Sequence, residues 1–188
     1  MMEYLSSRVS VERGDGRWSV VISARPTKSK RIMLLIWAAA WLLCGVLIIA
    51  ERNQVPEGDP LRQYLLAFLA FWLYFMLKVG KGVLWRLKGF ELWRVKDGQL
   101  TIKDSIFGYG RARSFFAENI EQLGLLAIDR SSWKWQWNES VWNVGGERLG
   151  FAHQGTKVAF GKSLTDDEAK RLVPMLKDAL RKSSKTGQ

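Results

Sequence analysis

Two apolar runs lie close together near the start of this 188-residue chain. The first, residues 32–50, carries no charged side chain and is about 28 Å long as a helix, which matches a bilayer core of about 30 Å. The second starts at residue 64, and a polar link separates the two. A helix that is apolar on all sides must be buried, either in lipid or in a protein core. Soluble domains of this size rarely contain such a helix, so the runs predict a transmembrane helical hairpin.

A cleaved signal peptide is the other explanation for an apolar run near the N-terminus. Its apolar region is about 7–15 residues long and is followed by a cleavage site between small residues. Here the first run is longer, begins only at Ile32, and is followed by Glu51 and Arg52. We therefore expect the first helix to be retained.

Basic residues flank both apolar runs, whereas the link between the runs contains only Arg52 and Arg62. Positively charged flanks remain in the cytoplasm. Both flanks therefore predict the same topology, with two spans, an external loop, and both termini in the cytoplasm.

The second apolar run, 64–77, is too short to cross a bilayer alone, so its helix must continue to about residue 88. The extension places basic side chains and a tryptophan on one helix face at spacings of three and four. Residues before the first span add further positive charge. We call the whole set the basic collar: Arg25, Lys28, Lys30, Arg31, Lys78, Lys81, Trp85 and Lys88.

Two explanations of the basic collar remain open. Its lysines can extend to the head-group layer, where tryptophan is also favoured. Alternatively, the collar binds an anionic lipid head group, since each charge near the surface contributes about 1 kcal/mol of attraction. Both explain part of the net charge of +11. No nucleic-acid-binding motif is present, so we expect membrane lipids, and not nucleic acid, as partners.

The N-terminal segment contains two stretches rich in β-branched residues, 8–12 and 18–23, on either side of Gly14 and Gly16. This pattern predicts a β-hairpin. An isolated hairpin is only marginally stable in water. The two strands therefore need a larger sheet, and the sequence offers one only beyond the second apolar run.

The chain from residue 90 onward is typical of short antiparallel strands followed by one helix. Strands are expected at 92–96, 99–103, 105–116, 120–128, around 133–142, 148–153 and 157–160. Thr165 and Glu168 form a capping-box pattern at the start of the helix. Apolar residues then recur at helical spacing: Ala169, Leu172, Val173, Leu176, Ala179 and Leu180. Pro174 is expected to bend this helix or loosen one turn.

Four short segments, 85–91, 97–102, 158–161 and 164–169, together with the order of parts over about residues 30–181, carry a likeness to a known group of proteins. The chain resembles the bacterial pleckstrin-homology-like (PH-like) domains, specifically uncharacterised bacterial two-transmembrane-helix proteins with such a domain in the cytosol. In outline it is also similar to the photosystem I assembly factor of chloroplasts and cyanobacteria. The resemblance implies about seven strands forming a bent sheet, one end of which is closed by a C-terminal helix. It also implies the bacterial inner (plasma) membrane.

The expected fold class is therefore membrane α+β, in which a two-helix transmembrane hairpin is joined to a PH-like antiparallel β-barrel or sandwich capped by a C-terminal helix. The expected parts are a cytosolic β-hairpin and basic flank at 1–31, spans at 32–50 and 64–88, an external loop at 51–63, a PH-like domain at 89–182, and a flexible tail at 183–188.

A tryptophan-rich stretch is the main candidate for contact with a partner. Three of its indoles alternate with polar residues, so a strand would place them on one face. They can pack in a core or lie against the membrane interface. Alternatively they form an exposed hot spot for a protein partner or a second copy. The candidates are Trp133, Trp135, Trp137 and Trp142.

Residues for catalysis or metal binding are scarce. His153 is the single histidine, and Cys44 is the single cysteine and lies within the first apolar run. One cysteine can form neither an internal disulfide nor a cysteine-based metal site. The acidic residues 166–168 suit the first turn of a helix. We therefore expect no enzyme activity, cofactor or metal, and predict a membrane-anchored scaffold or assembly module, with recognition of anionic lipid as the alternative.

Overall fold

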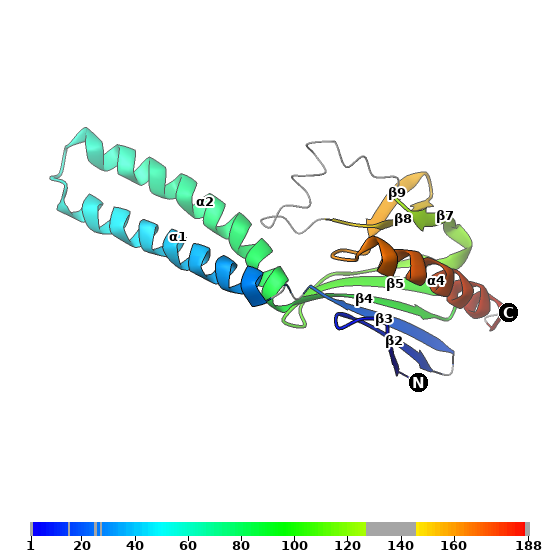
Figure 1. Cartoon of the computed structure of the whole chain (residues 1–188). Helices are drawn as coiled ribbons and strands as arrows, with labels where there is room; N and C mark the ends of the chain where they lie inside the picture. The colour runs from blue at the N-terminus through cyan, green and yellow to red at the C-terminus, as the bar shows by residue number, and fades with distance from the viewer. Residues whose placement is uncertain (1, 15, 25, 27, 127–145, 187–188) are drawn as a thin grey trace. The chain divides into compact units, whose positions relative to one another are not determined.

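The computed structural model describes the chain except for residues 1, 15, 25, 27, 127–145 and 187–188 (Figure 1). It divides into two compact units. The sheet unit combines residues 1–25 with residues 88–188, and the helical unit comprises residues 26–87. The helical unit is thus inserted into the chain of the sheet unit.

The helical unit contains α1 (Lys28–Gln54) and α2 (Pro60–Lys88). Asp59 caps α2, since its carboxylate accepts a hydrogen bond of 2.8 Å from the Leu61 N–H, and Pro60 occupies the first helical position, where its missing N–H costs nothing. The helices meet at Trp72. Its indole packs on Gly45 and donates a 3.1 Å hydrogen bond to the Trp41 carbonyl.

Both helices are long and apolar enough to cross a membrane. Only 11% of the most apolar stretch of each helix is buried within the protein. The core helix of a soluble domain would instead be mostly buried, so these helices do not form a core in this chain.

The sheet unit begins with a six-stranded antiparallel sheet whose strands follow the order of the chain. Its strands are β1 (Met2–Tyr4), β2 (Val9–Gly14), β3 (Arg17–Ser23), β4 (Gly89–Lys96), β5 (Gln99–Ile106) and β6 (Ala112–Phe116). β3 pairs directly with β4, from Arg17 opposite Lys96 to Ser23 opposite Phe90. The N-terminal hairpin therefore joins the C-terminal sheet. This pairing was expected, because a two-stranded hairpin by itself is only marginally stable in water.

A three-stranded antiparallel sheet and the last helix complete the unit. After a 3-10 turn, η1 (Ala117–Asn119), come β7 (Ile120–Leu125), β8 (Leu149–His153), β9 (Thr156–Phe160) and α4 (Asp166–Thr186). The predicted capping box is confirmed: the Thr165 N–H donates to Glu168 at 2.8 Å, and the Glu168 N–H donates to the Thr165 hydroxyl at 3.2 Å.

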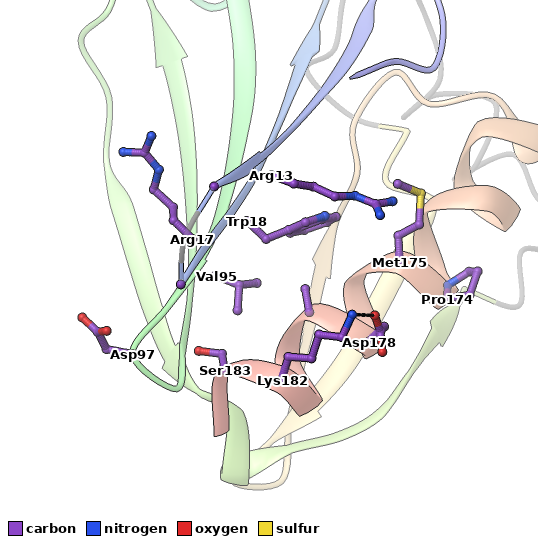
Figure 2. A pocket seen from close by; sticks show the side chains of 13 residues that line it. Arg13, Arg17, Trp18, Val95, Asp97, Pro174, Met175, Asp178, Lys182 and Ser183 are labelled. Carbon is purple, nitrogen blue, oxygen red and sulfur yellow. Dashed lines mark ion pairs between the residues drawn. The ribbon is translucent and has the colours of Figure 1, made fainter. Parts of the chain in front are cut away.

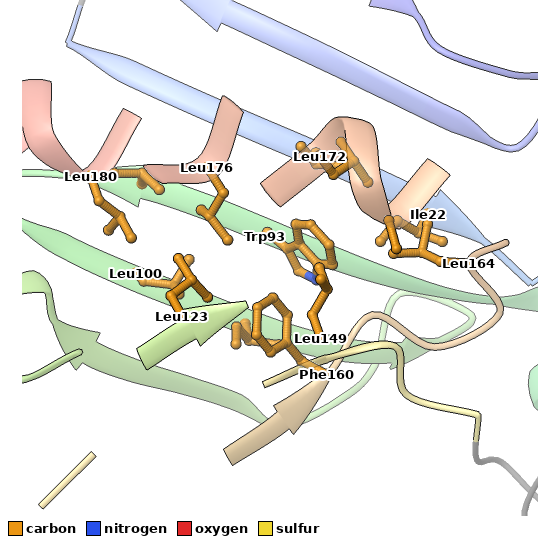
Figure 3. Packing of buried hydrophobic residues seen from close by; sticks show 14 of the residues in the cluster. Ile22, Trp93, Leu100, Leu123, Leu149, Phe160, Leu164, Leu172, Leu176 and Leu180 are labelled. Carbon is orange, nitrogen blue, oxygen red and sulfur yellow. The ribbon is translucent and has the colours of Figure 1, made fainter. Parts of the chain in front are cut away.

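The core lies where α4 and the smaller sheet cover one face of the larger sheet (Figure 3). Trp93 is fully buried, and its ring meets that of Phe160 edge-on, with centroids 4.9 Å apart. The predicted apolar stripe of α4 faces this core: Ala169, Leu172, Leu176 and Leu180 are buried, and Val173 and Ala179 pack against the cluster.

Most strand predictions are confirmed, including the turns at Asp97–Gly98 and Gln154–Gly155. The single strand predicted at 105–116 is wrong, because β5 ends at Ile106 and β6 begins at Ala112. Phe107 and Gly108 adopt positive φ angles there and reverse the chain. At the C-terminal end α4 continues through Ser183, which sequence alone assigns to a flexible tail. The Ser183 hydroxyl accepts a 2.7 Å hydrogen bond from the Gly98 N–H, which fixes that turn of the helix.

Candidate binding surfaces

A groove of about 570 Å³ lies between the β2–β3 turn, the end of β4 and the C-terminal half of α4 (Figure 2). We call it the distal groove. Trp18 and Val95 belong to the hydrophobic core and contribute its apolar surface, and Pro174, Met175 and Ala179 contribute the side formed by α4. Pro174 has no N–H, so the Lys170 carbonyl one turn earlier receives no helical hydrogen bond.

Charged side chains surround this apolar surface. Arg13 reaches toward Met175, whereas Arg17 extends away from α4 (Figure 2). Arg17 pairs with Glu12 at 3.4 Å, and Lys182 pairs with Asp178 at 2.9 Å. Hydrogen bonding from Lys182 is the main cause that lowers the pKa of Asp178. The side chains of these pairs are substantially exposed, so a ligand that offers a carboxylate can exchange with them at little cost.

The basic collar is only partly described. Arg25 lies outside the described residues. Lys28, Lys30 and Arg31 are exposed at the start of α1, and Lys78, Lys81 and Lys88 are exposed near the end of α2. Because the two helices are antiparallel, both basic groups belong to the same end of the helical unit.

Two aromatic residues of α2 change the description of the basic collar: Tyr74 contacts one of its lysines, and Trp85 is buried. Lys78 lies over the ring of Tyr74, with its ammonium 5.7 Å from the ring centroid, a cation–π geometry. Trp85 is 3% exposed, so it is not a surface residue of this chain. The described part of the collar therefore consists of exposed cations without an exposed indole.

The tryptophan-rich candidates Trp133, Trp135, Trp137 and Trp142 lie outside the described residues, and their role stays a prediction. Among the described residues no cluster of three or more histidine, cysteine or acidic side chains is suited to a metal ion. His153 packs its ring against Phe115, with centroids 5.1 Å apart.

Glu91 is a buried carboxylate that sequence analysis did not single out. It is 1% exposed and accepts hydrogen bonds from Trp93 Nε1 at 2.9 Å, from the Gly161 N–H at 2.9 Å and from the Lys162 N–H at 2.7 Å. Burial raises the pKa of Glu91, against the lowering effect of these three bonds, and nearby Asp104 adds to the rise. The carboxylate therefore ties β4 to the segment that follows β9.

The signal for Glu91 was present in the sequence. In 89–96 alternate residues point inward, and Glu91 shares its face with Trp93 and Val95. A charged residue on an apolar strand face needs hydrogen-bond partners. The sequence does not reveal them, because Gly161 and Lys162 lie about 70 residues further along the chain.

Fold and surfaces together define an α+β chain in which two long apolar helices are inserted into an antiparallel sheet domain capped by a C-terminal helix. No model of a known protein family matches the chain, and no curated protein sequence matches it either.

Proposed function

We propose that this chain is a membrane-anchored binding module, a scaffold or assembly factor that presents its sheet domain at the cytoplasmic face of a bacterial inner membrane. One observation carries the proposal: two helices with exposed apolar surfaces interrupt the chain between the neighbouring strands β3 and β4. Exposed apolar surface on this scale requires a partner, and lipid suits two helices of this length.

The insertion also supports a role in positioning. Residues 24–27 join β3 to α1, and no residue separates α2 from β4. Four residues span at most about 14 Å. Such short connections leave no long flexible tether between the sheet domain and the anchor, as a scaffold needs.

The sheet domain is, in this proposal, PH-like. Within residues 30–181, the described residues form six antiparallel strands, β4–β9, in two sheets, and α4 follows them and packs against both sheets. The antiparallel strands and the closing helix support this part of the proposal. A fold of this kind serves many functions, so the fold by itself does not define the ligand.

The distal groove is the proposed site for a protein partner, and its occupant is an extended segment that carries apolar and acidic side chains. Trp18 and Met175 offer apolar contact, and Arg13, Arg17 and Lys182 offer cations. The groove lies at the end of the sheet marked by the Arg17–Lys96 pair. The connections to the helices leave from the opposite end, so the groove is accessible to a cytosolic protein.

Cys44 provides a direct test of the membrane anchor, because it is the single cysteine and is exposed on α1. In intact cells and inverted vesicles it should resist a membrane-impermeant maleimide and react only after solubilisation. Rapid labelling without detergent would contradict the anchor. A C-terminal green fluorescent protein should fluoresce, whereas an active alkaline phosphatase fusion would reverse the topology.

Affinity purification in mild detergent tests the scaffold role. An Arg17→Glu, Lys182→Glu variant should lose co-purifying proteins that the original chain retains. The matched control changes the net charge equally by reversing two exposed cations that do not line the groove, Arg94→Glu and Lys157→Glu. A clean monomer without partners under several growth conditions would contradict the scaffold role.

Recognition of anionic lipid head groups by the basic collar is the second candidate function. It is supported by the exposed cations that gather at one end of the helical unit. Binding of soluble anionic head groups should weaken steeply with salt, because exposed charges are screened within about 10 Å at moderate ionic strength. Binding at the distal groove should respond less, because apolar contact with Trp18 and Met175 adds to the contribution of its charges.

A further inference from the structure

The turn between β5 and β6 exposes two aromatic side chains. Tyr109 is 86% exposed and Phe107 is 59% exposed, although both belong to a tight hairpin. The Ile106 N–H donates to the Tyr109 carbonyl at 2.8 Å, and the Tyr109 N–H donates back to Ile106 at 3.0 Å. Neither ring is required to close this turn, since backbone hydrogen bonds close it.

The conformation of Phe107 makes its presence more unusual. Phe107 and Gly108 have φ angles of 54° and 87°, as in a type I′ turn. Glycine, asparagine and aspartate favour this conformation, and a bulky aromatic residue does not. Strained residues of this kind gather at functional sites.

Two other turns of the sheet unit provide an internal comparison. Asp97–Gly98 and Gln154–Gly155 have the same pair of positive φ angles, and each begins with an exposed polar residue. Among these three described turns, only the turn at Phe107 has an aromatic residue at its first position. Turn geometry therefore does not explain the aromatic residue.

The three turns also differ in where they lie. Ile106 pairs with Gly89, the first residue of β4, and Ser23 at the end of β3 pairs with Phe90. The Phe107 turn is thus at the end of the sheet where the chain leaves for the helices and returns from them. Asp97–Gly98 follows the opposite end of β4, and Gln154 follows His153, whose ring contacts Phe115 near that same opposite end.

The length of α2 indicates the depth in a bilayer at which the end of the sheet beside Gly89 would lie. α2 has 29 residues and is about 44 Å long. A bilayer measures about 40–45 Å when its head-group layers are included. Because β4 follows α2 without a linker, an α2 that spans the membrane would bring Gly89, and the turn beside it, to the outer edge of the head groups.

Cations accompany the two rings. Lys103 donates from its ammonium to the Gly108 carbonyl at 3.1 Å, and Arg111 and Arg113 are exposed. Neither arginine has an ion-pair partner among the described residues. Aromatic rings favour the interface of a bilayer, and basic side chains are attracted to its anionic head groups.

The turn is also held in shape before any ligand binds. The Ser105 hydroxyl donates to the Tyr109 carbonyl at 3.3 Å. A Cβ on Gly110 would collide with the Asp104 carbonyl, so only glycine permits this path of the chain. A rigid turn loses little conformational freedom on binding.

We propose that the β5–β6 turn is a second membrane contact, which inserts Phe107 and Tyr109 into the head-group layer of anionic phospholipid while Arg111 and Arg113 bind phosphates. This proposal rests on the membrane anchor of the proposed function. The contact would fix the orientation of the sheet domain on the membrane, with the distal groove turned toward the cytosol.

The test uses the full-length chain, with Cys44→Ser, reconstituted in vesicles and labelled at single cysteines with an environment-sensitive fluorophore. Phe107→Cys and Tyr109→Cys report on the proposed contact. Gln154→Cys is the matched control, since its turn has the same pair of positive φ angles but belongs to the smaller sheet, near the opposite end of the sheet unit. Vesicles contain phosphatidylcholine alone or with about one third phosphatidylglycerol.

We expect labels at 107 and 109 to shift to shorter emission wavelengths and to be quenched by head-group spin-labelled lipid, whereas the label at 154 stays accessible to aqueous iodide. Phosphatidylglycerol should strengthen this quenching, and Arg111→Glu with Arg113→Glu should abolish the gain. Equal iodide access at 107, 109 and 154 would overturn the membrane contact. A gain that survives both arginine substitutions would overturn the role of the arginines.

Failure of this contact is distinguishable from failure of the anchor. A label at Cys44, in the chain without the Cys44→Ser substitution, reports on α1 in the same vesicles. If that label is protected by lipid while labels at 107 and 109 are not, the anchor stands and the second contact is wrong. If the label at Cys44 is exposed to water, the anchor itself is wrong.

Discussion

Replacing Glu91 by glutamine isolates the part that its buried charge plays in joining β4 to the end of β9. Glutamine retains one carbonyl oxygen, which can still accept from Trp93 Nε1 and the Gly161 N–H. Its amide group would face the Lys162 N–H, now 2.7 Å from the carboxylate, and two donors would then oppose each other. The buried N–H loses its acceptor, at a cost of about 1–3 kcal/mol.

Two further effects enter the balance for Glu91→Gln. The bonds from Trp93 and Gly161 change from charge-assisted to neutral, which weakens each roughly twofold. Against this, glutamine avoids the burial of a charge, the main cause of the raised pKa of Glu91. We expect a net loss of about 1–3 kcal/mol in the free energy of unfolding near neutral pH.

Hydrogen exchange measured by mass spectrometry on the detergent-solubilised full chain locates this loss. Amides of Gly161 and Lys162 should exchange faster in Glu91→Gln, while amides in the middle of β2 and β3 change only by the global loss of stability. Chemical denaturation supplies that global value. Unchanged exchange at Gly161 and Lys162 with an unchanged denaturation midpoint would refute the bracing role of the carboxylate.

The pH dependence of the same variant has a definite sign. The folded pKa of Glu91 is raised above its ordinary value of 4.5. Between these two values the folded state binds more protons than the unfolded state, so stability falls as pH rises. The variant lacks this titration. The stability difference between the original chain and Glu91→Gln should therefore be larger near pH 4 than at neutral pH, and a difference that grows with pH would contradict this reasoning.

Three other substitutions test the helical unit and the cap of α4. Gly45→Leu should destabilise the helical unit by about 1–3 kcal/mol, because the new side chain collides with Trp72. The control Gly80→Ala has open space around it and should be neutral or slightly stabilising. Thermal melts in detergent measure both effects. Thr165→Ala should cost about 1 kcal/mol by removing the cap of α4, and an unchanged melt would contradict the capping box. Glu168→Gln should destabilise the protein most at neutral pH and least in acid. Partial burial opposes ionisation of Glu168, but the hydrogen bonds from Thr165 and Ser6 and the charge of Arg8 outweigh this effect and lower the pKa of Glu168. The stabilisation by the Glu168 carboxylate is therefore present above the ordinary pKa of 4.5 and is lost as pH falls through the folded pKa. Denaturation at several pH values checks that order.

Local patterns were sufficient for the elements whose residues interact with near neighbours. The capping box of α4 joins residues three apart, and the Asp97–Gly98 turn closes a hairpin between adjacent segments. The prediction of a single strand at 105–116 was wrong because the sequence did not reveal the turn within it. That turn begins with Phe107, a residue type that the patterns of turn chemistry assign to strands.

The binding surfaces were predicted less well than the elements. The exposure of the described cations of the basic collar could be expected from the sequence, because charged side chains are seldom buried without a partner. The distal groove could not, since Arg13 and Trp18 lie about 160 residues from Met175 and Lys182. Burial of Trp85 likewise depends on its surroundings, and helical spacing does not provide them.

The sequence by itself determined the two apolar helices, most of the strands and the amphipathic last helix, because hydrophobic periodicity and turn chemistry are properties of neighbouring residues. Only the tertiary structure decided that β3 pairs with β4 across the helical insertion, that Glu91 is satisfied by Gly161 and Lys162, and that Phe107 lies at the end of the sheet from which the helices depart. These features arise from contacts between segments far apart in the chain, where strand register and burial, and not local propensity, set the partners.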